Sequence, residues 1–126
     1  MMKSGLIILF CFIVVLAGLL MRGWLYFGGC NDAILQQKQS PDKSYHVTVF
    51  ERDCGATTDF STIVNIQRPH KRFDPKRGSN VLVIKGRSSI ELSWPPEGGL
   101  DVSYSTGEVF KSDTLWNGVR IQCKHQ

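Results

Sequence analysis

The stretch SIELSWPPEGGLDVSY, residues 89–104, indicates how most of this chain folds. Apolar and polar residues alternate through 89–94 and again through 100–104, on either side of a turn rich in proline and glycine. Alternation with a period of two is typical of strands that bury one face and leave the other solvated. The stretch therefore predicts two short strands joined by a turn at 95–99.

The same pattern continues outward from this pair. Short alternating or apolar runs at 44–51, 60–66, 80–85 and 114–124 predict further strands, separated by turn signals such as Ser40-Pro41-Asp42 and Asn117-Gly118. Strands about ten residues apart with such turns favour an antiparallel meander, sandwich or small barrel. The predicted fold class is mainly β, a small antiparallel meander or sandwich over residues 30–126.

The first 29 residues have a different character. SGLIILFCFIVVLAGLLM, residues 4–21, carries no charge, and about 20 apolar residues span the ~30 Å hydrocarbon core of a bilayer. Arg22 can reach the interface, and Trp24, Tyr26 and Phe27 are rings expected at headgroup level. Residues 1–29 are therefore predicted to be a single-pass transmembrane anchor, and 30–126 an exported β-rich domain.

Two alternatives for this segment stay open. It can be a cleaved signal peptide with Lys3 as its basic region, although a clear A-x-A cleavage site is missing. It can also lead to a lipoprotein modified at Cys30. The expected location is the bacterial inner membrane with the β-domain outside the cytoplasm, because the short N-terminal tail makes export of the remainder the default.

Length and charge exclude several classes of function. The chain has 126 residues, and all 11 acids and 13 of the 15 bases lie from Cys30 onward, a balance of only about +2. A multidomain enzyme, a nucleotide fold with several βαβ units and a strongly nucleic-acid-like charge are excluded. No phosphate loop, catalytic carboxylate pair or common hydrolase motif is present. We expect no catalysis and no cofactor.

The cysteines suggest one disulfide. Cys11 lies in the apolar span, and Cys123 shares its parity with Val119 and Ile121, as a buried thiol would. Cys30 and Cys54 lie in turn-rich segments on either side of the strand predicted at 44–51. A bridge between them would close a loop of about 25 residues, contribute roughly 3 kcal/mol and require an oxidising compartment.

Residues 40–45 (SPDKSY), 49–58 (VFERDCGATT) and 63–66 (IVNI) resemble a family of small uncharacterised bacterial proteins. Those proteins carry an N-terminal hydrophobic or lipoprotein segment, an SPDGKY-like turn and an FxRDCGATT-like stretch. The resemblance covers about residues 30–67 and implies that Cys30 and Cys54 are a matched pair. It implies no activity. Lys43 stands where the family has glycine, so the turn needs either φ > 0 at Lys43 or another turn type.

The densest polar motif is Arg52-Asp53-Cys54-Gly55, which continues through Ala56 to Thr57 and Thr58. We interpret it as a disulfide-anchored turn in which Asp53 accepts backbone N–H groups, while Thr57 and Thr58 begin the next strand. The alternative is a Cys54 nucleophile helped by Arg52, with His46 or His70 as base.

A basic segment follows, in residues 68–77. Its bases are Arg68, Lys71, Arg72, Lys76 and Arg77. Two prolines and a following glycine predict an exposed loop. Such a loop suits contact with anionic lipid or with an envelope protein, and basic residues near an anionic surface contribute about 1 kcal/mol each. Nucleic acid is not expected, because only Phe73 is interleaved with the bases.

Two weaker signals remain. Cys123 and His125, with Cys30 and Cys54, could form a zinc set, but CxxC and HxxxH spacings are missing, so no metal site is predicted. Trp94-Pro95-Pro96 and Trp116 could line a groove, although packing is the preferred interpretation.

The sequence thus favours a non-catalytic, membrane-tethered binding module of the bacterial envelope. One alternative is an immunity or inhibitor protein that blocks an exported toxin or hydrolase through the loop at 97–101. The other is a small thiol-dependent enzyme that uses Cys54.

Overall fold

A computed structural model describes residues 2–27, 29–55 and 59–126 of the chain, which divides into units 1–30 and 31–126. The first unit is helix α1 (Met2–Phe27). Its segment Lys3–Trp24 has 22 residues, a mean hydropathy of 2.8 and no residue buried against protein. At 1.5 Å per residue this segment is about 33 Å long, enough to cross a bilayer core. The helix has the properties that a membrane anchor and a signal sequence share.

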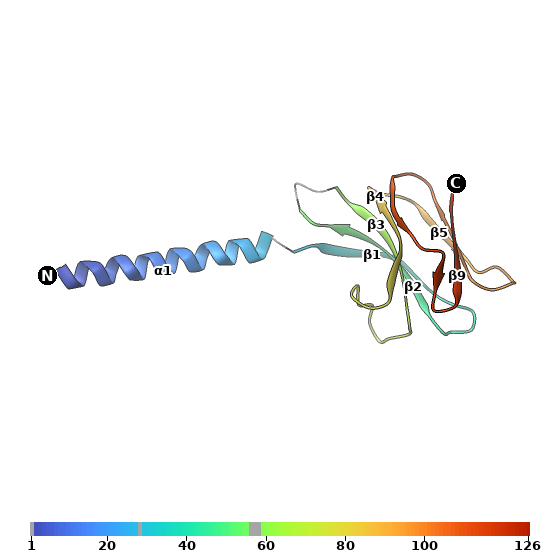
Figure 1. The fold of residues 1–126 in the computed structure, drawn as a ribbon, viewed down its shortest axis with the longest axis horizontal. Coiled ribbons are helices and arrows are strands. Elements are labelled where there is room, and N and C mark those ends of the chain that lie inside the picture. The colour runs from blue at the N-terminus through green and yellow to red at the C-terminus, as the bar shows by residue number, and fades with distance from the viewer. Residues whose placement is uncertain (1, 28, 56–58) are drawn as a thin grey trace. The chain divides into compact units, whose positions relative to one another are not determined.

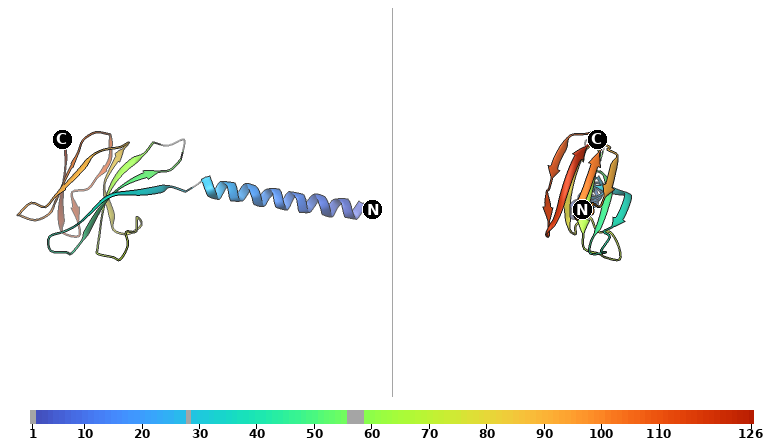
Figure 2. Two further views of the ribbon diagram at one scale, coloured as in Figure 1. Left: turned by 180° about the vertical axis from the view of Figure 1, so that it is seen from behind. Right: turned by 90° about the vertical axis from the view of Figure 1, so that its right-hand side faces the viewer.

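The second unit consists of two β-sheets, as Figures 1 and 2 show. The five-stranded sheet has the order β1 (Asn31–Gln39), β2 (His46–Asp53), β3 (Ser61–Gln67), β4 (Ser79–Lys85), β7 (Val109–Ser112). The four-stranded sheet has the order β5 (Ile90–Ser93), β6 (Leu100–Tyr104), β9 (Val119–His125), β8 (Leu115–Trp116). The mainly-β prediction with an N-terminal apolar helix is confirmed.

The core lies between the two sheets, and each sheet contributes apolar side chains from alternating positions. One hydrophobic cluster joins Val47, Val49, Val64, Ile66 and Ile84 of the first sheet to Ile90, Leu92, Leu100, Val102 and Ile121 of the second. The period of two at 89–94 and 100–104 arises from this burial, because Leu92 and Val102 are opposite each other in the β5–β6 register. The second unit is therefore a small β-sandwich.

The pairing of the strands differs from a simple meander in two places, because β4 pairs with β7 and β6 pairs with β9. β6 and β9 run parallel, whereas every other pair described is antiparallel. The run predicted as one strand at 114–124 is divided into β8 and β9. Asn117 and Gly118 divide it, with φ of 44° and 80°, and two residues with positive φ are typical of a tight hairpin turn.

The sequence analysis missed two strands, β1 and β7, which form opposite edges of the five-stranded sheet. β1 reads NDAILQQKQ and is mostly exposed, so it lacks the alternation of a half-buried strand. Its register with β2 shifts between Ile34 and Gln36, where Leu35 bulges out. β7 has only four residues.

The prediction that each strand has one solvent-exposed face is wrong for β2 and β3. Val47 and Val49 face the core, yet Thr48 and Phe50, which alternate with them, are also buried, with 1% and 0% exposed. Ile63 of β3 is buried as well. The segment after β3 covers this outer face of the sheet, and that long-range contact leaves no trace in the local alternation.

The predicted disulfide is confirmed, whereas Cys123, predicted to be buried, is half-buried. Cys30 and Cys54 form a disulfide, while Cys11 and Cys123 are free thiols. Disulfides persist in oxidising compartments, so the bridge suggests that the β-sandwich is extracytoplasmic.

A matched pair of leucine variants tests the position of the core. Leu100 is 1% exposed and Leu115 is 64% exposed. We expect Leu100→Ala to lower the free energy of unfolding by about 2–5 kcal/mol, because it leaves a cavity between the sheets. Leu115→Ala should change it by about 0.5 kcal/mol or less. Urea unfolding of the full chain in neutral detergent, followed by tryptophan fluorescence, measures both, and equal losses would contradict the sandwich.

Candidate functional site

The segment 68–78, called the basic loop below, folds back over the outer face of β2 and β3. Phe73 packs on Phe50, with ring centroids 5.2 Å apart, which explains why Phe50 is fully buried outside the main core. The Arg52 guanidinium lies 5.4 Å from the centroid of the same Phe50 ring. An aromatic contact therefore anchors the middle of the basic loop to the sheet.

Two buried amide side chains hold the second half of the loop. Asn65 is 0% exposed, and its Nδ2 donates to the carbonyl of Arg77 at 3.1 Å and to Oδ1 of Asn80 at 2.9 Å. Gln67 is 3% exposed, and its Nε2 donates to Oδ1 of Asn65 at 2.8 Å and to the carbonyl of Asp74 at 3.2 Å. A buried polar group without a partner costs about 1–3 kcal/mol, so these amides favour the one loop conformation that satisfies them.

Local turn geometry completes the loop. Asp74 Oδ1 accepts from the backbone N–H of Lys76 at 2.9 Å, and the Asp74 carbonyl accepts from that of Arg77 at 3.0 Å. Gly78 then has φ of +65°, and a Cβ there would overlap the carbonyl oxygen of Ile66. Only glycine lets the chain return to β4 this close to β3.

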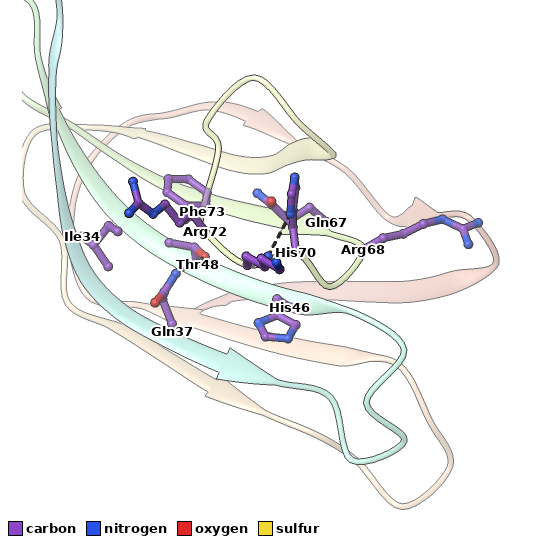
Figure 3. Close-up of a pocket in the computed structure, with 10 residues that line it drawn as sticks. Ile34, Gln37, His46, Thr48, Gln67, Arg68, His70, Arg72 and Phe73 are labelled. Atoms are coloured by element: carbon purple, nitrogen blue, oxygen red, sulfur yellow. Dashed lines mark hydrogen bonds between the residues drawn. The ribbon is translucent and has the colours of Figure 1, made fainter.

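A pocket of about 410 Å³ lies between the first half of the basic loop and the sheet, shown in Figure 3. Residues from β1, β2, the end of β3 and the loop line it: Ile34, Gln37, His46, Thr48, Gln67, Arg68, His70, Lys71, Arg72 and Phe73. The lining contains three basic residues, two histidines and no acidic residue. Arg68 lines the pocket near its backbone and extends its guanidinium away from it (Figure 3).

The cations at this pocket have no acidic partner. Arg68, Lys71 and Arg72 are exposed, and no carboxylate of the described residues lies within 4.0 Å of their charged nitrogens. Five other bases of the sandwich are paired: Arg52 with Asp32, Lys85 with Asp59, Arg87 with Glu51, Lys111 with Asp113 and Arg120 with Glu97. Single lysines elsewhere, Lys38, Lys43 and Lys124, also have no acid of the described residues within 4.0 Å, but the pocket is where three unpaired bases lie within five residues. Positive charge is thus left uncompensated at the pocket, where it attracts anions.

One histidine has a defined hydrogen-bonding state. The backbone N–H of Lys71 donates to Nδ1 of His70 at 2.8 Å, the contact marked by a dashed line in Figure 3. When Nδ1 accepts, the proton of a neutral imidazole is on Nε2. His70 therefore offers an N–H donor in both its neutral and its charged form.

The predicted contact bases separate into two groups. Arg68, Lys71 and Arg72 line the pocket, whereas Lys76 does not. Arg77 lies 3.7 Å from Oδ2 of Asp74 and is partly compensated.

The sequence analysis missed the contributions of β1 and β2 to this site. One signal of this site was present in the sequence: Asn65 interrupts the apolar residues of the predicted strand, and Gln67 follows directly after that strand. Buried Asn and Gln side chains require hydrogen-bond partners, which another segment must supply.

The motif at 52–58 is structural where the structure describes it. Arg52 forms a two-pronged contact with Asp32, at 2.7 and 2.9 Å, and this hydrogen bonding raises the Arg52 pKa. Asp53 Oδ1 accepts from the backbone N–H of Gly55 at 3.0 Å, as predicted. Thr57 and Thr58 lie outside the described residues. Cys54 is in the disulfide, so this state has no thiol there to act as a nucleophile.

The tryptophans pack as predicted, and a pocket of about 790 Å³ lies beside Trp94. Trp94 and Trp116 contact the core, with Tyr45 between them at centroid distances of 5.5 and 6.2 Å. Burial raises the Tyr45 pKa, and hydrogen bonds from Ser40 and Ser44 lower that of Asp42 nearby.

The turn at 40–45 has positive φ at Lys43, one of the two forms that the sequence left open there. Lys43 has φ of 61°.

The residues considered as possible zinc ligands make other contacts. Cys30 and Cys54 bond to each other, and His125 packs edge-on against Tyr104 at 5.3 Å. Burial raises the Cys123 pKa, which keeps this thiol protonated at neutral pH. Within the described residues, no group of three or more potential metal ligands comes together.

Comparisons with known proteins find no relative of this chain. A scan against protein-family models, a search of curated proteins and a search of solved structures each return no match for this chain. The family resemblance of residues 30–67 stays a prediction.

Two glycine variants test how closely the basic loop approaches the sheet. Gly78→Ala and Gly86→Ala both place alanine at positive φ, which costs about 1 kcal/mol or slightly more. A Cβ at Gly86 meets open space, whereas one at Gly78 meets the backbone of Ile66, so Gly78→Ala should cost about 1–2 kcal/mol more. The comparison is made by urea unfolding, and equal costs would show that the loop does not lie against β3.

Proposed function

We propose that this chain is a non-catalytic binding module, tethered to the bacterial inner membrane by α1, whose exported sandwich binds an anionic partner at the basic loop. The apolar helix and the disulfide support the tether and the compartment. The basic loop supports the binding role because it is structured, exposed and adjacent to a pocket.

The uncompensated charge of Arg68, Lys71 and Arg72 is the observation that carries the proposal. Three like charges within five residues repel one another, and the surrounding sandwich pairs many of its other bases with acids. A fixed loop that keeps such charges unpaired is less stable than a neutral one, and function is a common reason for that cost. Binding of an anion would relieve the repulsion.

A binding role fits these residues better than the alternatives. The thiol enzyme needs a free Cys54, which the disulfide removes. The inhibitor alternative depends on the loop at 97–101, where Glu97 lies 3.7 Å from Arg120. That loop lines a second pocket of about 790 Å³ beside Trp94. Its Glu97 is partly compensated by Arg120, whereas the cations at the pocket under the basic loop have no acidic partner among the described residues.

Neutralising the pocket cations tests the proposal. The variant Arg68→Gln/Lys71→Gln/Arg72→Gln should elute from a dextran sulfate column at clearly lower salt than the unmodified full chain in neutral detergent. Attraction between exposed charges is screened over about 8–10 Å at physiological salt, so removal of three clustered cations has a large effect on retention.

A control variant separates local clustering from net charge. Lys38→Gln/Lys111→Gln/Lys124→Gln removes three exposed cations outside the basic loop and lowers the formal net charge equally, from +4 to +1. The control should stay close to the unmodified chain in its elution. The proposal fails if both triple variants elute together.

A further inference from the structure

We infer that the pocket under the basic loop is a binding site for the phosphate group of a small organic phosphate ester. This inference rests on the proposed function and identifies the chemistry that the same site recognises. The phosphate would contact the loop cations, and its carbon substituent would contact the apolar side of the pocket.

The directions of the donors favour phosphate over carboxylate. On the sheet side, His46 comes from β2 and Gln37 from the adjacent strand β1. On the opposite side, His70, Lys71 and Arg72 come from the loop that covers the sheet. A carboxylate is planar and is matched by a single guanidinium fork. A phosphate ester has several oxygens in a tetrahedral arrangement, so it can accept from donors on different sides at once.

Several donors are available without breaking a contact within the protein. Nε2 of the exposed Gln37 uses one hydrogen to donate to Thr48 Oγ1 at 3.3 Å, which leaves its second amide hydrogen available to a ligand. Nε2 of His70 carries a proton while Nδ1 accepts from Lys71. Lys71 and Arg72 have no acid of the described residues within 4.0 Å. A bound phosphate would therefore meet donors that are already unpaired.

The size and the apolar part of the pocket indicate a small organic carrier. About 410 Å³ falls within the range of about 300–1,000 Å³ typical of small-molecule sites. Ile34, which is 52% exposed, and Phe73 provide apolar contact on the β1 side. Inorganic phosphate would leave this apolar surface unused, so an ester should bind more tightly.

Binding of glycerol 1-phosphate tests the inference. The full chain in dodecyl maltoside micelles, in a buffer without phosphate, is titrated with glycerol 1-phosphate, with inorganic phosphate, with glycerate as the carboxylate analogue and with uncharged glycerol. Isothermal titration calorimetry should show saturable binding of glycerol 1-phosphate, weaker binding of inorganic phosphate and glycerate, and none of glycerol. Line broadening in ³¹P spectra should confirm the order of the two phosphates.

Variants locate the binding. His70→Gln and Arg72→Gln should each weaken glycerol 1-phosphate binding about tenfold or more, as expected for the loss of a hydrogen bond to a charged group. Lys124→Gln, which removes an exposed cation in β9, should leave the affinity unchanged. Equal urea midpoints for all variants confirm that the losses are not unfolding.

A competition arm identifies the source of the phosphate. Phosphatidylglycerol added to the micelles displaces glycerol 1-phosphate if the natural ligand is a lipid headgroup, and phosphatidylcholine serves as the zwitterionic control. Failure of phosphatidylglycerol to compete supports a soluble ester instead. The inference is overturned if glycerol 1-phosphate does not bind, or binds equally to the His70 and Arg72 variants, while dextran sulfate retention still depends on the basic loop. Loss of both would overturn the proposed function too.

Discussion

The hydrogen bonds of two buried amides are the constraint on which the candidate site depends. Asn65 and Gln67 are in β3, where an apolar residue would be the ordinary occupant, and they bond to each other and to the carbonyls of Asp74 and Arg77. Removing their partners would leave buried polar groups unsatisfied, so the basic loop and the outer face of β3 stabilise each other. The pocket exists because this contact holds the loop over the sheet.

The fold was predictable where burial is decided by neighbouring residues. The β5–β6 pair follows from the alternation at 89–104, and β6 begins and ends at the residues predicted. The disulfide was also predictable, because Cys123 shares its parity with the buried Ile121. These features depend on short sequence patterns and turn residues, which a single sequence displays directly.

The candidate site was predictable only in part, because contacts distant in sequence create it. The bases of the loop were evident as a charge cluster, but the alternation in β2 implied that Thr48 and His46 face solvent. Only the return of the loop, with Phe73 on Phe50, encloses that face. β1 was missed because an exposed edge strand carries polar residues on both faces, so it shows no period of two.

The central claim is that the two amides fix the basic loop on the sheet. Hydrogen–deuterium exchange of the full chain in detergent tests this claim most directly, by comparing the unmodified protein with Asn65→Ala. The account predicts that peptides covering 74–78 are protected in the unmodified chain and exchange much faster in the variant, while β5 and β6 keep their protection. Fast exchange of 74–78 in the unmodified chain, or no change on substitution, would contradict it.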